Sequence, residues 1–166
     1  MSVSTIGDAF GLLPLGSYLM TSAHGGHRSG LVVSSLVRCC QDPALICVSA
    51  RKGHRIDSLI RDSRSFAVGI MSADDKMIAR KFKSSDSAPP ALHQPIEDDP
   101  FDGLDTKTFE TGSPLLMRCT TWFDCEVMRR IDLESDTELF VGLVVGLMHN
   151  GERIKIERKK DLEEHH

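Results

Sequence analysis

The sequence lacks the features that mark several common classes of protein. Aromatic residues make up only 5% of its 166 residues, and no apolar run approaches the roughly 20 residues of a membrane-spanning helix. The formal net charge is −4, so no general excess of positive charge exists to attract nucleic acid or an acidic membrane surface. We therefore expect no nucleic-acid partner and no membrane partner. The N-terminus lacks the charged-then-apolar pattern of a secretory signal, which predicts a cytoplasmic protein.

The cysteines and histidines do not form a recognisable disulfide or metal pattern. The five cysteines are an odd number, and no two of them make a C-x-x-C pair. Cys119 and Cys125 share the parity of an apolar row, which predicts small core residues in a reducing compartment. His24 and His27 flank two glycines without a further ligand at a suitable spacing, so an exposed turn is favoured. We expect no metal site.

The length of the chain predicts one domain. A chain of 166 residues can bury a core but is too short for two ordinary domains. We assign residues 1–160 to a single domain and residues 161–166 to a tail, whose Glu-Glu-His-His ending is typical of the start of a purification tag.

Residues 84–112 hold four of the seven prolines, seven acidic residues and one lysine. Such a segment predicts a lid, an arm on a partner subunit or a solvated insertion.

Most apolar segments follow the two-residue period of β-strands. Because most successive strands have no helix between them, the sequence predicts a mainly β protein with short helices, and an antiparallel barrel is favoured over a doubly wound α/β sheet. About six or seven strands are expected. The predicted strands cover residues 16–23, the first half of 30–43, 44–50, 66–71, a single strand over 114–129, 138–148 and an edge strand over 153–157.

Three short helices complete this prediction. One begins at Thr5 or Asp8, ends before Pro14 and is expected to lie over one end of a sheet. Another begins with a capping box formed by Ser72 and Asp75. The third, over residues 54–63, should bury one apolar stripe and expose its charged residues. The stripe consists of Ile56, Leu59 and Ile60, and the expected solvent side consists of Arg55, Asp57, Arg61 and Asp62.

A candidate binding site lies around the stretch 30–43 and the basic cluster that follows it. Asp42 and Pro43 interrupt the β pattern, so two strands joined at a turn are expected. The cluster Arg51–Arg55 then opens the helix, where free backbone N–H groups and the positive end of the helix dipole attract phosphate. We interpret the cluster as the anion end of a cofactor site. Ser34 and Ser35 belong to no nucleophile elbow or triad, which argues against hydrolysis.

In their order along the chain, these segments resemble the flavin reductase-like family, the FMN-binding split barrels. The centre of the resemblance is G-L-V-V-S-S-L at residues 30–36, similar to the family's G-M-T-V-S-S-F and followed by Asp42-Pro43 where the family has D-P. The resemblance covers about residues 10–148. Further matches are Lys52, I-R-D-S-x-x-F at 60–66, G-x-P-L-L at 112–116, F-D-C-E-V at 123–127 and L-F-V-G at 139–142.

The resemblance implies a homodimer of antiparallel six- to seven-stranded split β-barrels, each subunit binding one FMN, or alternatively FAD. It implies an NAD(P)H:flavin oxidoreductase, in which hydride passes from NADH or NADPH to the flavin. The expected partner protein is a monooxygenase or another electron acceptor. Because the flavin carries this chemistry, no catalytic side chain is assigned. The residues that the resemblance places beside the ring are Val33, Ser34, Ser35 and Leu36, with Val37 and Arg38 close by; those near the phosphate are Ser49, Lys52, His54 and Arg55.

The sequence also departs from the family pattern. His54 and Ile56 stand where S-x-T is frequent, and Thr137 stands in place of a histidine that the family associates with nicotinamide. Two alternatives stay open, the first favoured by Thr137 and the second by its use of a similar phosphate pocket. One is an FMN-binding electron-transfer protein of the flavoredoxin kind without nicotinamide activity, and the other is a pyridoxamine-phosphate-oxidase-like split barrel. In a third, non-functional interpretation, Lys52, His54 and Arg55 are solvated charges at a helix start.

Overall fold

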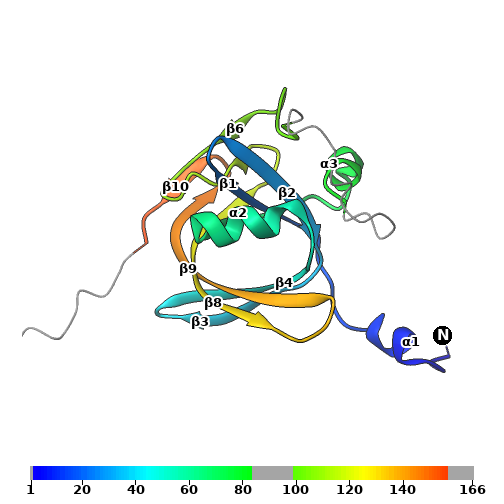
Figure 1. The fold of residues 1–166 in the computed structure, drawn as a ribbon. Helices are drawn as coiled ribbons and strands as arrows, with labels where there is room; N and C mark the ends of the chain where they lie inside the picture. Colours follow the sequence, from blue (N-terminus) through cyan, green and yellow to red (C-terminus); the bar gives the residue numbers. More distant parts are fainter. Residues whose placement is uncertain (1, 84–98, 157–166) are drawn as a thin grey trace, which may run out of the picture.

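Seven strands follow one another in the main sheet of the computed structural model, which describes residues 2–83 and 99–156 (Figure 1). Each pairs with its neighbours in antiparallel orientation, so the predicted mainly β, antiparallel barrel is confirmed. In sheet order the strands are β2 (His27–Val33), β1 (Tyr18–His24), β5 (Ser65–Ile70), β8 (Thr121–Asp132), β9 (Thr137–His149), β4 (Ala44–Arg51) and β3 (Leu36–Gln41). Strand β10 (Glu152–Ile154) adds to β9, and β6 (Thr106–Lys107) pairs with β7 (Leu115–Leu116).

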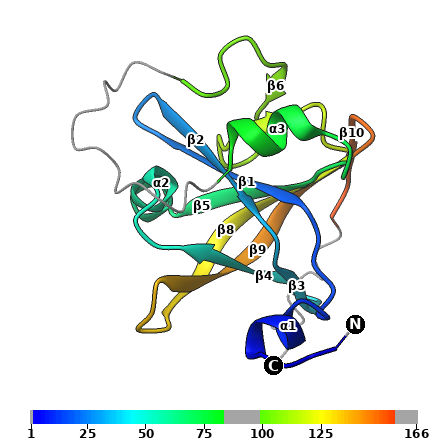
Figure 2. The same ribbon diagram turned by 90° about the vertical axis from the view of Figure 1, so that its right-hand side faces the viewer.

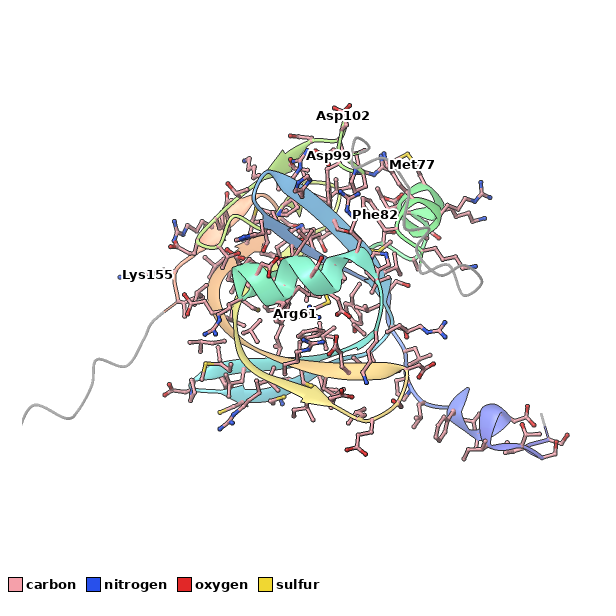
Figure 3. All side chains as sticks on the ribbon, viewed as in Figure 1. Arg61, Met77, Phe82, Asp99, Asp102 and Lys155 are labelled. Atoms are coloured by element: carbon pink, nitrogen blue, oxygen red, sulfur yellow. The ribbon has the colours of Figure 1, made fainter. Side chains whose placement is uncertain are left out.

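The helices α2 (Arg55–Ser63) and α3 (Lys76–Lys81) pack against the sheet. In Figure 1, α2 lies between the β1–β2 hairpin and the curved strand β9, and its apolar stripe is buried as predicted. Helix α3 begins at an Asp75 cap, so the predicted Ser72 capping box is wrong and the helix starts one turn later. Figure 3 shows Phe82 directed from the end of α3 toward the barrel, whereas the exposed Met77 faces away.

Helix α1 (Ile6–Phe10) does not cover the sheet. Thr5 and Asp8 form a capping box that starts it, yet none of its residues is buried. Figures 1 and 2 show the helix standing away from the barrel, so its predicted position over one end of a sheet is wrong. The capping bonds are local to residues 4–8, and they stabilise a helix without placing it on a neighbour.

Two strands that were predicted as continuous are broken. The β pattern through residues 30–38 is interrupted at Ser34–Ser35, because the carbonyl oxygens of these residues accept the N–H groups of Gly16 and Ser49 outside the ladders. The predicted strand 114–129 is likewise two strands. Its first part, β7, pairs with β6, and a turn then leads into β8 at Thr121.

Strand β8 has side chains buried on both faces. Asp124 alternates with the apolar row of Cys125, yet it is fully buried, because Glu110 and Thr111 donate hydrogen bonds to it and β8 lies between two clusters of core residues. A bulge between Asp124 and Cys125 shifts the register of β8 against β9 at this point. Cys119 and Cys125 are buried in these clusters as predicted. In β9, Gly142 allows close packing, since an added Cβ there would lie 2.6 Å from the ring of Phe66.

Residues 99–112 cover one of these clusters. The buried Phe101 ring lies 4.9 Å from that of Phe82, and Asp99 forms an ion pair with Arg28 at 2.5 Å. Of the three alternatives predicted for residues 84–112, the solvated insertion is therefore wrong for residues 99–112. Residues 84–98 and 157–166, which include the predicted tail, lie outside the described part. In the described ranges, no helix has the length and apolar character needed to cross a bilayer.

Candidate functional site

A shallow depression of about 210 Å³ lies where β2 ends and β4 runs beside β9. Its rim carries hydroxyl groups and one guanidinium group, and its floor is apolar. The rim comes from the turn after β2, from β4 and from the first residue of β9, so segments distant in sequence meet there. The rim residues are Ser34, Ser35, Ser49, Arg51 and Thr137, and the floor residues are Leu31, Val32, Val33 and Ala50.

Backbone hydrogen bonds hold the Ser34–Ser35 turn in place from two sides. The N–H of Gly16, just before β1, donates to the carbonyl oxygen of Ser34 at 3.1 Å. The N–H of Ser49 on β4 donates to the carbonyl oxygen of Ser35 at 3.4 Å. Because the turn bridges β1 and β4, its two hydroxyl groups are presented on a constrained backbone.

The cations beside the depression are paired with the β8–β9 hairpin. Arg51 contacts Asp136 at 3.3 Å, and the Lys52 ammonium forms an ion pair with Asp132. The backbone N–H of Lys52 also donates to the carbonyl oxygen of Asp136 at 2.8 Å. These ion pairs are partly exposed, and such pairs contribute only about 0–1 kcal/mol each. An incoming anion could therefore compete with either carboxylate.

The start of α2 is stabilised by its own side chains. His54 is the N-cap residue, and its Nδ1 accepts the N–H of Ile56 at 3.2 Å. Asp57 accepts the N–H of Gly53 at 3.1 Å through Oδ2. Burial and then the charge of Arg55 lower the pKa of His54, which favours the neutral imidazole that the cap requires. The backbone N–H groups of Gly53 and Ile56, which belong to the helix start predicted to bind a phosphate, are thus already bonded within the chain.

A buried acidic pair lies behind this turn. Asp57 was predicted on the solvent side of the helix, but it is buried together with Glu138 at the start of β9. The register explains this position, because Glu138 lies opposite Ala50 and therefore just before the turn that leads into α2. Arg130 on β8 donates to Glu138 Oε2 at 2.5 Å. The helix thus turns an acidic side chain inward at its first turn.

The structure brings together some of the predicted site residues and separates others. Val33, Ser34, Ser35 and Ser49 line the depression, whereas Lys52, His54 and Arg55 occupy the adjoining turn and helix start. The other predicted residues, Leu36, Val37 and Arg38, lie on β3 and are not among the lining residues: Leu36 packs against the core, and Val37 and Arg38 are exposed.

Five lining residues were missing from the predicted site: the apolar Leu31, Val32 and Ala50, and the polar Arg51 and Thr137. Arg51 and Thr137 are partners in the β4–β9 register, and together they close one side of the depression. The signal for Arg51 was the basic cluster itself. Thr137 had been noted only as a departure from the family pattern, and the pairing of two strands more than 80 residues apart is what places it beside Arg51. Within residues 2–83 and 99–156, no group of three or more His, Cys, Asp or Glu side chains is placed to hold a metal ion.

Comparison with known proteins identifies the family. The model for the "Flavin reductase like domain" matches residues 10–157, which is most of the chain. The chain belongs to the flavin reductase-like family. Among its curated relatives, a putative diflavin flavoprotein of Synechocystis is 27% identical over 128 residues, covering 76% of this chain but only 21% of the relative. A ferric-chelate reductase (NAD(P)H) of Archaeoglobus fulgidus is 26% identical over 140 residues, with 83% and 78% covered.

Solved structures share the fold of this family member. An NADH:FAD oxidoreductase of Streptomyces globisporus superimposes with a TM-score of 0.71 at 21% identity, covering 95% of this chain and 98% of the other. An FMN-binding protein of Thermus thermophilus gives a TM-score of 0.72 at 17% identity, covering 90% and 79%. At these identities the likeness supports the barrel fold and does not transfer individual contacts.

Replacing His54 should separate its capping role from any other role. His54→Ala should lower the free energy of unfolding by about 1 kcal/mol, whereas His54→Asn, which can also cap, should lose little. Because the folded-state pKa of His54 is lowered, its stabilisation is present above its ordinary pKa and is lost as pH falls through the folded pKa. Urea unfolding at several pH values tests this. A wild-type profile that matches His54→Asn at every pH would contradict it.

Proposed function

We propose that this protein is an NAD(P)H-dependent flavin reductase that binds FMN in the depression and places the FMN phosphate near the basic turn. The observation that carries the proposal is the hydroxyl-rimmed depression directly beside Arg51, Lys52 and the start of α2. Family membership supports it, as do relatives named as a ferric-chelate reductase (NAD(P)H) and an FMN reductase (NADH). FAD remains the alternative flavin, since one structural neighbour is an NADH:FAD oxidoreductase.

The residues present fit part of an FMN molecule. The apolar floor of Leu31 and Val33 suits one face of an aromatic ring, and the three serine hydroxyls suit a polyhydroxyl chain. Arg51, Lys52 and Arg55 supply positive charge for a phosphate. The volume of about 210 Å³ is smaller than the roughly 300–1,000 Å³ of complete small-molecule pockets, so a further surface is needed to enclose the rest.

In this proposal the chain binds and orients, and the cofactor reacts. When bound, the flavin supplies the two-electron chemistry. The constrained Ser34–Ser35 turn would hold one edge of the flavin, and the floor residues would exclude water from one of its faces. Arg51 and Lys52 would release their hairpin carboxylates to hold the phosphate. No side chain of this site needs to act as a general acid or base.

We further propose that the protein is a homodimer whose second subunit completes the depression. Exposed apolar side chains support an interface: Val37 is 55% exposed and Met128 54% exposed, and Ile6 and Phe10 on α1 are exposed too. Sedimentation equilibrium with added FMN should give twice the mass of the chain. A monomer mass at concentrations that saturate FMN binding would exclude a shared site.

A second candidate is a flavin-binding electron carrier without nicotinamide activity. It is favoured by Thr137, which lines the depression and stands where the family frequently has a histidine. For either candidate we propose a monooxygenase or another electron-acceptor protein as the partner, because one relative is the reductase subunit of a stachydrine N-demethylase. A cytoplasmic location is also proposed, since all five cysteines are free thiols.

Activity measurements distinguish these candidates. Purified protein should oxidise NADH or NADPH in the presence of FMN, and FMN should be preferred over riboflavin. Turnover with either nicotinamide supports the reductase. Flavin binding without turnover supports the carrier, and failure to bind FMN, FAD and riboflavin would reject both.

Removing cations should weaken FMN selectively. Lys52→Ala and Arg55→Ala should each reduce FMN affinity by about tenfold, because they remove charge from the phosphate end, while riboflavin affinity should change less than about twofold. Arg61→Ala, an exposed cation in the last turn of the same helix (Figure 3), is the matched control and should change neither. Titration by flavin fluorescence measures both ligands. Equal losses for FMN and riboflavin would refute this placement of the phosphate.

A further inference from the structure

Two buried carboxyl groups meet behind the turn that joins β4 to α2. Glu138 is fully buried and Asp57 is only 8% exposed. One oxygen of each is bonded, since Asp57 Oδ2 accepts the N–H of Gly53 and Glu138 Oε2 accepts Nε of Arg130. The other two oxygens, Asp57 Oδ1 and Glu138 Oε1, are buried without a donor among the described residues. The two side chains lie within hydrogen-bonding reach of each other.

A single proton would satisfy both of the remaining oxygens. Two adjacent buried carboxylates repel each other, and an unbonded buried oxygen is costly. A proton on Asp57 Oδ1 can donate to Glu138 Oε1, which removes one negative charge and bonds both atoms. The other charged groups that act on the pair are Arg130, which contacts Glu138 directly, and Lys52, which is bonded to Asp132.

The electrostatic surroundings place that proton on Asp57. Burial, and then the hydrogen bond with Glu138, raises the pKa of Asp57 to about 6. Burial acts to raise the pKa of Glu138 as well, but hydrogen bonds from Asp57 and Arg130 outweigh it, and the net shift is downward. These opposite shifts favour a protonated Asp57 beside an ionised Glu138 at mildly acidic pH.

We propose that Asp57 and Glu138 share one proton and that this acid pair positions the Gly53 turn, which carries Lys52 and His54. Asp57 connects the pair to the turn, because the oxygen that does not face Glu138 accepts the Gly53 N–H. Gly53 has φ +81°, a left-handed conformation that this hydrogen bond helps to hold. Loss of the shared proton puts a second negative charge behind a turn that, in the proposed function, faces a phosphate.

The pH dependence has a definite sign. The folded-state pKa of Asp57 is raised, so the stabilisation from its proton is fully present below its ordinary pKa and is lost as pH rises through about 6. His54 on the same helix acts in the opposite direction, because its folded-state pKa is lowered. The contribution of the acid pair to stability is therefore obtained by comparing the pH dependence of unfolding between the wild type and variants that all keep His54.

The experiment uses amides that imitate the protonated pair. Asp57→Asn can donate its NH₂ to Glu138 and still accept the Gly53 N–H, and Glu138→Gln can donate to Asp57 and still accept from Arg130. Between about pH 5 and pH 8, the folding equilibrium constant of the wild type should fall about tenfold relative to either variant, measured by urea unfolding without flavin. Asp62→Asn, an exposed carboxyl group on α2, is the control and should keep the wild-type profile.

Two further measurements test the proton and the turn separately. If either variant fails to fold, the wild type alone suffices, because the infrared absorbance of a protonated carboxyl group should disappear as pH rises through about 6. Amide hydrogen exchange at Gly53 should be faster in Asp57→Ala than in Asp57→Asn at the same pH, because only asparagine keeps the acceptor. The proposal would be overturned if Asp57→Asn and Glu138→Gln retained the wild-type pH profile, or if the wild type showed no protonated carboxyl absorbance below about pH 6. Equal exchange at Gly53 in Asp57→Ala and Asp57→Asn would also overturn it.

Only the flavin measurement rests on the proposed function. At about pH 8, Asp57→Asn should bind FMN about three- to tenfold more tightly than the wild type, since it lacks the charge behind the turn, and riboflavin should bind equally to both. The phosphate of FMN itself titrates near pH 6, so wild type and variant are compared at one pH. A wild type that binds no FMN rejects the proposed function, while the unfolding and exchange results still decide the acid pair. Unequal riboflavin binding would overturn the charge effect.

Discussion

The pairing of β9 with β8 on one side and with β4 on the other is the constraint on which the rest of the structure depends. Its register sets Thr137 opposite Arg51 and Glu138 opposite Ala50, so the start of β9 forms one wall of the depression and also places an acid behind the turn into α2. Gly142 makes the double pairing compatible with the core, because any side chain there would meet Phe66. The same hydrogen bonds therefore organise the barrel and the site.

The second organising feature is the balance of charge around the first turn of α2. The hairpin between β8 and β9 supplies Asp132 and Asp136 to the cations of the turn, and the start of β9 supplies Glu138 beneath it. A cluster that the sequence shows as purely basic is thus nearly neutral in the fold. Exposed ion pairs of this kind are weak, so a phosphate would replace contacts rather than fill an uncompensated positive site. Selectivity for an anion then depends on geometry as much as on net charge.

The sequence was sufficient to predict the barrel, because alternation along single strands is a local property that survives folding. It also predicted the buried stripe of α2 and the turn at Asp42-Pro43. The family resemblance placed Val33, Ser34 and Ser35 in one group and Ser49 in another, and all four line the depression. It failed where a distant partner decides the outcome. Asp57 is turned inward by its bond to Gly53 and by Glu138, and Asp124 is buried because Thr111 and Glu110 donate to it. No periodicity in the sequence can show such partners.

The departures from the family pattern at the start of α2 have a common physical basis. Where S-x-T is frequent, His54 caps the helix through Nδ1 and Ile56 is fully buried in the core, so both positions serve the stability of the helix. Asp57 completes this arrangement by bonding the Gly53 N–H from below. Hydroxyl groups at these two positions would contact the phosphate. In the proposed function, the neighbouring cations make those contacts instead. Because long cationic side chains adapt to a ligand more readily than backbone N–H groups, a helix start stabilised by its own side chains remains compatible with binding an anion.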